Sequence, residues 1–143
     1  MNTFNYVLRA LAIGIFGVAL IHILLGVSSE PLLGSGISEL SIRDPNLDSQ
    51  NRFYGAAFAL YGAVLWICSA DLQRYRSFLL AALGLFFLAG LTRVVSALVV
   101  GWPALPVIVL AAIEIFGPPA MFLWFRGLPL EPNEKVASGD DVS

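Results

Sequence analysis

Residues 78–125 read FLLAALGLFFLAGLTRVVSALVVGWPALPVIVLAAIEIFGPPAMFLWF and hold two long apolar runs, 78–100 and 104–125. Each run can cross a hydrocarbon core about 30 Å thick, because a helix needs about 20 apolar residues to do so. The Gly-Trp-Pro segment at 101–103 leaves room only for a tight turn, and its tryptophan suits the headgroup level of a bilayer. This stretch therefore predicts an antiparallel pair of transmembrane helices.

Two further apolar runs precede this pair, at residues 7–27 and 53–70. Hydrophobic residues make up 58% of the 143-residue chain and charged residues only 13%, whereas soluble domains carry about 25% charged residues. Lipid cannot hydrogen-bond an exposed backbone, and the runs lack the alternation of a β-barrel strand, so all four should be α-helices. We expect an all-α membrane protein, a four-transmembrane-helix bundle over residues 1–126.

The polar segments predict how this bundle is oriented. The connection 28–51 is charged and must leave the hydrocarbon, and residues 127–143 have the composition of a disordered tail. Most basic residues fall on one side of the membrane: Arg9, Arg74, Arg76, Arg126 and Lys135, against Arg43 and Arg52 on the other. The positive-inside rule then places both termini and the tail in the cytoplasm.

Composition also excludes several classes of site. The net charge of −2 and the scattered basic residues give no stripe that could follow nucleic-acid phosphates. A single cysteine, Cys68, excludes an internal disulfide and a thiolate metal cage, and the lone His22 cannot supply bis-histidine haem ligation. The first apolar run exceeds the length of a signal-peptide core, so we expect it to be a retained span. We expect no metal and no cofactor.

Two charged side chains fall inside the predicted helix pair. Arg93 lies within 78–100 and Glu114 within 104–125, where charged residues are rare and costly, so both are candidates for a functional site. Counted from Trp102 at about 1.5 Å per residue, their depths differ by only about 4–5 Å. The two side chains should therefore be within reach of each other.

This pair has two interpretations that the sequence leaves open. A buried ion pair would fix the register of the two helices. Alternatively, Arg93 would anchor an anion or a carbonyl group, and Glu114 would act as a proton acceptor or counter-ion. A structure that placed them on opposite faces of the bundle would remove the second interpretation.

Other polar residues lie at the ends of the first two runs. His22 shares a helix face with Ala19 and Gly26, which predicts an interior, hydrogen-bonded histidine at a helix contact. Asp48 suits the N-cap of the second helix and is spaced i, i+4 from Arg52, so the two should form an ion pair.

Small residues on the second run predict where it meets a neighbour. Gly55, Ala59 and Ala63 form a small-xxx-small row, which lets another helix approach closely. Under the predicted topology, a set of polar residues falls in the outward half of the membrane or near its midplane. We expect this set to converge on one ligand-binding pocket: His22, Arg52, Tyr54, Arg93, Ser96 and Glu114.

Several polar stretches resemble those of a known family. They are DPN at 44–46, DSQNRFYG at 48–55, GLTR at 90–93, and AIE at 112–114 followed by Pro118. Over about residues 8–126 the chain resembles the bacterial family catalogued as domain of unknown function 4345, small four-helix membrane proteins. The resemblance implies the topology and a location in the bacterial inner membrane, and it highlights Arg52, Arg93 and Glu114 without assigning roles. The chain is more distantly similar to DoxX-type proteins, some linked to quinone or thiol redox chemistry, but it lacks the cysteine pair of a thiol relay.

Three classes of function follow from these observations. The one we favour is a protein that binds a lipid, a quinone or another amphipathic small molecule in an intramembrane polar pocket. The second is an accessory or structural subunit of a larger membrane complex, or a homo-oligomer. The third is a proton-coupled transporter or membrane enzyme that uses Glu114 and His22. No nucleophile–base arrangement, phosphate loop or metal motif supports an enzyme, so we expect none.

Overall fold

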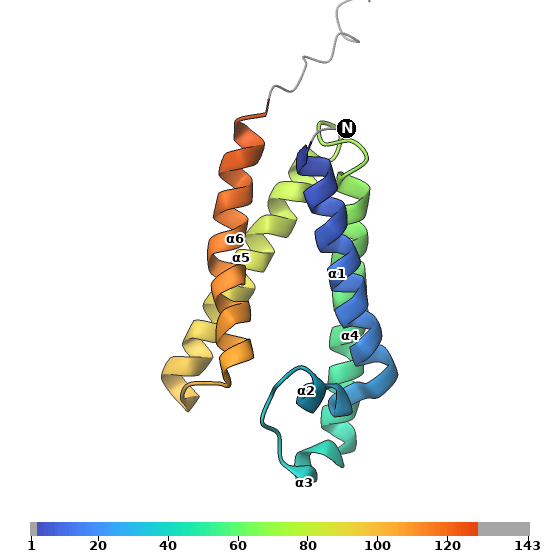
Figure 1. The fold of residues 1–143 in the computed structure, drawn as a ribbon, viewed down its shortest axis with the longest axis vertical. Helices are drawn as coiled ribbons and strands as arrows, with labels where there is room; N and C mark the ends of the chain where they lie inside the picture. The colour runs from blue at the N-terminus through green and yellow to red at the C-terminus, as the bar shows by residue number, and fades with distance from the viewer. Residues whose placement is uncertain (1–2, 129–143) are drawn as a thin grey trace, which may run out of the picture.

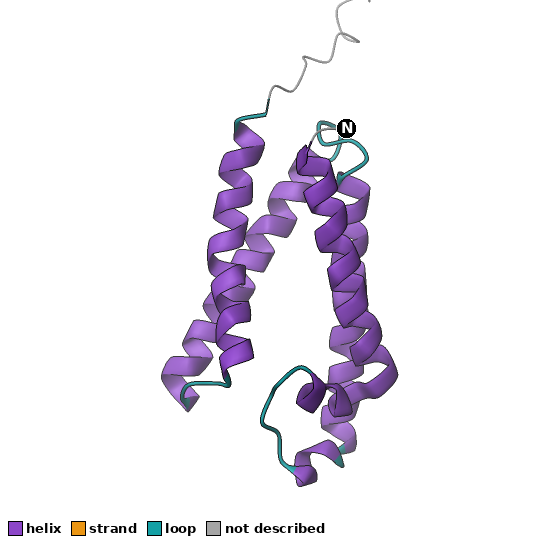
Figure 2. Cartoon of the chain, viewed as in Figure 1, coloured by secondary structure: helices purple, strands orange, loops and turns teal. Residues whose placement is uncertain are grey.

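The computed structural model describes residues 3–128, and the rest of the predicted tail lies outside the described residues. Every regular element in this range is helical, which confirms the all-α prediction (Figures 1 and 2). The elements are α1 (Thr3–Leu25), the 3₁₀ turn η1 (Gly26–Ser28), α2 (Ser29–Leu32), α3 (Glu39–Ile42), α4 (Pro45–Cys68), α5 (Arg76–Val100) and α6 (Leu105–Arg126).

Three segments are long and apolar enough to cross a membrane: Thr3–Leu32, α5 and α6. They contain the predicted runs 7–27 and 78–100, and all of the run 104–125 except Ala104, which is the N-cap of α6. The remaining run, 53–70, lies mostly in α4, whose first turns are polar and whose last residue is Cys68. The integral-membrane character of the chain follows from these three segments.

The start of α4 differs from the prediction. The helix begins at Pro45, so part of the predicted 28–51 connection is helical, and Asp48 is not the N-cap. Asp44 caps the helix, because its Oδ1 accepts the backbone N–H of Asn46 at 2.8 Å. Proline is favoured directly after such a cap, since its missing N–H has no partner to lose there.

The four long helices form two arms (Figure 1). The pair α1–α4 is one arm and α5–α6 is the other, and the arms approach each other at the end where the chain begins. The hydrophobic core lies at this end and draws on all four helices: Phe4, Leu8, Ala12, Leu65, Cys68, Leu72, Leu79, Ala82, Leu83 and Phe125. Toward the other end the arms diverge.

Specific contacts link the arms. The Tyr61 hydroxyl donates to the carbonyl of Ala82 at 3.1 Å, and the Tyr61 ring stacks on Phe86 with centroids 5.2 Å apart. At the diverging end, Gly34 of the α2–α3 connection packs against Pro106, the second residue of α6. The arms are therefore joined within their converging half and again by a loop at their diverging end.

Of the predicted small-residue row Gly55, Ala59 and Ala63 on α4, Gly55 makes a close contact with α1. A Cβ placed on Gly55 would lie 2.9 Å from the carbonyl oxygen of Ala19 and 2.9 Å from the backbone nitrogen of Ile23. Gly62 makes a similar approach to Phe16 and to the backbone of Ala12. Backbone atoms cannot move aside as a flexible side chain can, so these glycines set the distance between the two helices.

We predict that Gly55→Ala lowers the stability of the protein. Overpacking a close contact costs typically about 1–3 kcal/mol, and here the added methyl group meets backbone on the opposing helix. Thermal unfolding of the purified protein in mild detergent measures the effect. Gly84→Ala is the matched control, because nothing lies within 4 Å of a Cβ at Gly84. Equal melting temperatures for the two variants would contradict the predicted packing.

Candidate functional site

α5 and α6 approach each other closely at Gly90. A Cβ at this position would lie 2.8 Å from Ile115 Cγ1 and 3.0 Å from Glu114 Cβ, so only glycine leaves room for the opposing helix. Arg93 follows one turn later on the same face of α5. Its Nε donates to Glu114 Oε2 at 2.7 Å, which confirms that the two charged residues are within reach of each other.

The two members of this ion pair are unequally buried. Glu114 is 2% exposed, whereas 32% of the Arg93 side chain is exposed. A guanidinium carries five N–H donors, of which Nε supplies one and Nη1 and Nη2 supply four. Within residues 3–128, Nη1 and Nη2 of Arg93 have no hydrogen-bond partner. The Glu114 carboxylate is thus buried, whereas the guanidinium of Arg93 is accessible and keeps donors that a ligand could use.

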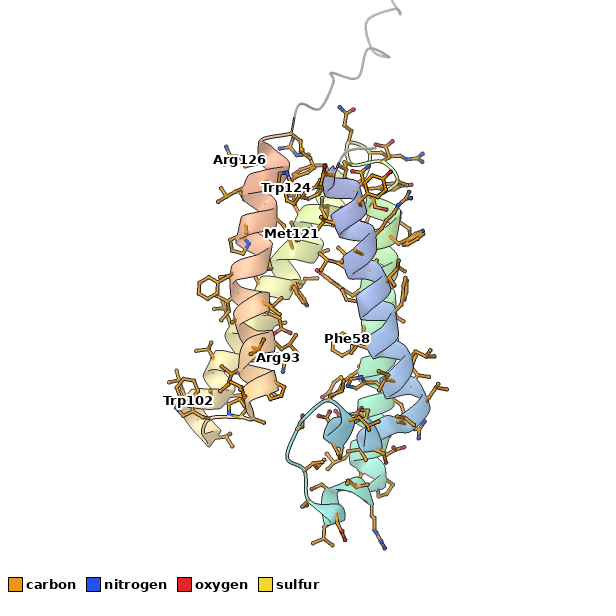
Figure 3. The ribbon with its side chains drawn as sticks, viewed as in Figure 1. Phe58, Arg93, Trp102, Met121, Trp124 and Arg126 are labelled. Atoms are coloured by element: carbon orange, nitrogen blue, oxygen red, sulfur yellow. The ribbon has the colours of Figure 1, made fainter. Side chains whose placement is uncertain are left out.

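A small cleft adjoins Arg93 between α5 and α6. Its volume is about 80 Å³, and apart from Arg93 it is lined by apolar or aromatic residues: Val94, Ala97, Leu98, Trp102, Pro103, Ile108 and Ala111. Figure 3 shows Arg93 on the side of the α5–α6 arm that faces the other arm, and Phe58 directed toward it from α4. A charged group thus borders an apolar cleft at the diverging end of the arms.

Arg52 stabilises the end of α1. Its Nη1 donates to the carbonyl oxygens of Ile23 at 2.6 Å and Leu24 at 3.2 Å, which are among the last carbonyls of α1 and lack helical partners. Its Nε donates to Asp48 Oδ2 at 2.7 Å, confirming the predicted i, i+4 pair. A cation at a helix C-terminus is also favoured by the helix dipole.

Asp48 completes this arrangement from the same turn of α4. Its Oδ1 accepts the backbone N–H of Val27 at 3.2 Å. Two hydrogen bonds hold the pKa of Asp48 below its usual 3.8: the one from Arg52 has the larger effect, and the one from Val27 N–H adds to it. Gly26, with a φ of +56°, lies directly against the Asp48 carboxylate. A side chain at Gly26 would be strained by the backbone conformation and would displace the carboxylate.

A second set of contacts at this end was not predicted from the sequence. Asn51 Nδ2 donates to Glu30 Oε1 at 2.8 Å, and the Ser29 hydroxyl donates to Asn51 Oδ1 at 3.1 Å and to the Gly26 carbonyl at 2.7 Å. The available signal was the spacing of Asp48, Asn51 and Arg52, which places them on one face of a helix. This face binds the reversing chain after α1.

The other candidate residues have separate surroundings. His22 is 6% exposed, its Nδ1–H donates to the Val18 carbonyl at 2.9 Å, and its ring lies edge-on to Phe58 at 5.7 Å. Tyr54 is 48% exposed and donates to Gln50 Oε1 at 3.0 Å, while Ser96 is exposed on α5. The structure joins Arg93 to Glu114 and Arg52 to the end of α1, and convergence of all six residues on one pocket stays a prediction.

The comparisons with known proteins give one match. The sequence model of the family described as "Domain of unknown function (DUF4345)" matches residues 3–125, nearly all of the described chain. No curated protein and no solved structure matches the chain.

We predict that Arg93→Gln destabilises the protein more than Glu114→Gln does. Arg93→Gln leaves the buried Glu114 carboxylate without a partner, and breaking a buried pair in this way costs about 3–5 kcal/mol. Glu114→Gln leaves a guanidinium that is one-third exposed, so its cost should be smaller. Thermal unfolding in detergent compares the two variants. A Glu114→Gln variant less stable than Arg93→Gln would show that the guanidinium is the more deeply buried partner.

Proposed function

Because the chain belongs to the DUF4345 family, and its apolar helices identify it as a membrane protein, we propose that it binds a lipid, a quinone or another amphipathic small molecule at Arg93. The protein crosses the cytoplasmic membrane four times, with α4 as the remaining span and both termini in the cytoplasm. Glu114 holds Arg93 in place, and the ligand meets the free side of the guanidinium.

The arrangement of the helices supports the four-span topology. α4 packs along α1, which is itself long and apolar enough to span, so α4 occupies the same depth. Arg9, Arg76 and Arg126 lie near helix ends, and Arg74 lies in the α4–α5 turn, all at the end of the molecule where the chain begins (Figure 1). An excess of arginine at one end is the feature that places this end on the cytoplasmic side.

The observation that carries the proposed binding activity is the unpaired side of Arg93. In a hydrocarbon environment, each polar group without a hydrogen-bond partner costs several kcal/mol. Nη1 and Nη2 have no partner within residues 3–128, although Arg93 is well inside α5, about 10 Å from its end at Val100. A ligand oxygen at this position would satisfy these donors, and the adjoining apolar cleft would take part of its chain.

One observation favours the alternative of a subunit in a larger complex. Nothing lies within 4 Å of a Cβ at Gly14 or Gly17 of α1, so this side of the arm is free for close approach by another helix. Stoichiometric co-purification of a second membrane protein, without a small molecule, would favour this alternative.

Native mass spectrometry of the protein extracted in mild detergent tests the proposed function. We expect a co-purifying small molecule whose occupancy falls about tenfold or more in Arg93→Lys, because a charge-assisted hydrogen bond contributes about 1.5–3 kcal/mol. Lysine keeps a cation beside Glu114 but cannot offer a planar fork of donors. Arg76→Lys, an exposed position on the same helix, is the matched control. Equal retention by both variants would refute binding at Arg93.

A further inference from the structure

The charge at the Arg93 site is already balanced before any ligand binds. The guanidinium and the Glu114 carboxylate lie 2.7 Å apart, and the other ionised residues of α5 and α6 are Arg76 and Arg126, at the opposite end of these helices. The adjoining cleft adds no further charge, since the rest of its lining is apolar or aromatic. The site therefore presents hydrogen-bond donors without a net positive charge.

An anionic head group would gain little at such a site. Its attraction to Arg93 is opposed by repulsion from the Glu114 carboxylate, which lies 2.7 Å from Nε of the same guanidinium, while the full cost of removing a carboxylate from water remains. A neutral carbonyl oxygen loses far less hydration and still accepts from Nη1 and Nη2. The balance of these terms favours the neutral acceptor.

We infer that the site selects a neutral carbonyl group, such as an ester or a quinone, attached to an apolar chain, and disfavours the free carboxylate of the same chain. This inference rests on the proposed function and specifies its ligand class. Cavities that enclose drug-sized ligands measure about 300–1,000 Å³, so a cleft of about 80 Å³ holds only a part of the ligand. The rest of the chain would extend into the surrounding lipid.

Glu114 is then the residue that determines specificity. Glu114→Gln removes the negative charge and leaves Arg93 as an uncompensated cation beside the same cleft. A carboxylate would now neutralise the site instead of making it anionic. The order of preference between ester and carboxylate should therefore reverse in this variant.

The experiment uses probes that differ only in the head group. Purified protein in dodecyl maltoside, a detergent without carbonyl groups, is titrated at pH 8 with hexadecanoate, methyl hexadecanoate or hexadecane, and the melting temperature is followed. We expect the ester to stabilise the wild-type protein at a concentration at least tenfold below that of the carboxylate, and hexadecane to have no effect. In Glu114→Gln the carboxylate should act at the lower concentration. Decylubiquinone is added as a fourth probe. If it stabilises the protein at a lower concentration than methyl hexadecanoate does, the site prefers a quinone carbonyl; the reverse order indicates a lipid ester.

Two outcomes would overturn the inference. One is a carboxylate that acts in the wild-type protein at the same concentration as the more effective neutral carbonyl probe, or at a lower one. The other is that neither the ester nor decylubiquinone stabilises the protein more than hexadecane does. The wild-type comparison decides the question even if Glu114→Gln does not fold. If a co-purified molecule is still lost in Arg93→Lys, the proposed function stands and only the neutral-carbonyl specificity fails.

Discussion

The hydrogen bond from Arg93 Nε to Glu114 Oε2 is the interaction on which the α5–α6 arm depends, because lipid supplies no alternative partner to either charge. Its formation requires a close approach of the two helices, which Gly90 permits by having no side chain. The pair cannot satisfy all of its own groups, since one carboxylate cannot accept every donor of a guanidinium in this geometry. The same interaction that holds the helices together thus leaves Nη1 and Nη2 available.

In the α1–α4 arm, polar side chains are likewise needed as hydrogen-bond partners, here for backbone groups at the C-terminal end of α1. α1 ends where the chain reverses through Gly26, and its last carbonyl oxygens need donors. Arg52 supplies them from α4, while Asp48 accepts Val27 N–H and Asn51 binds the Ser29–Glu30 segment. These three residues stand on one face of α4 and give the first arm a fixed end. The side chains of Asp48, Asn51 and Arg52 all bind the chain at the end of α1, whereas Nη1 and Nη2 of Arg93 have no partner within residues 3–128.

Hydropathy predicted the apolar runs because each must match the thickness of a bilayer, and counting along two antiparallel helices predicted that Arg93 meets Glu114. The seam at Gly55 and the Asp48–Arg52 pair were likewise predictable, since helical spacing alone defines them. The attachment of Arg52 to the end of α1 was not, because it depends on how two helices separated by a long connection pack together. The divergence of the arms could not be predicted from the sequence either, because hydropathy does not determine the angle at which helices cross.

The most direct test of the account is the environment of the Arg93 guanidinium in the membrane. A high-resolution cryo-electron microscopy map of the protein in nanodiscs of its native lipids would show which atoms lie beside Nη1 and Nη2. We expect an elongated non-protein density within hydrogen-bond distance of these nitrogens, continuing past the cleft at Val94 and Ile108. A map in which protein groups satisfy both nitrogens, with no such density, would contradict this expectation.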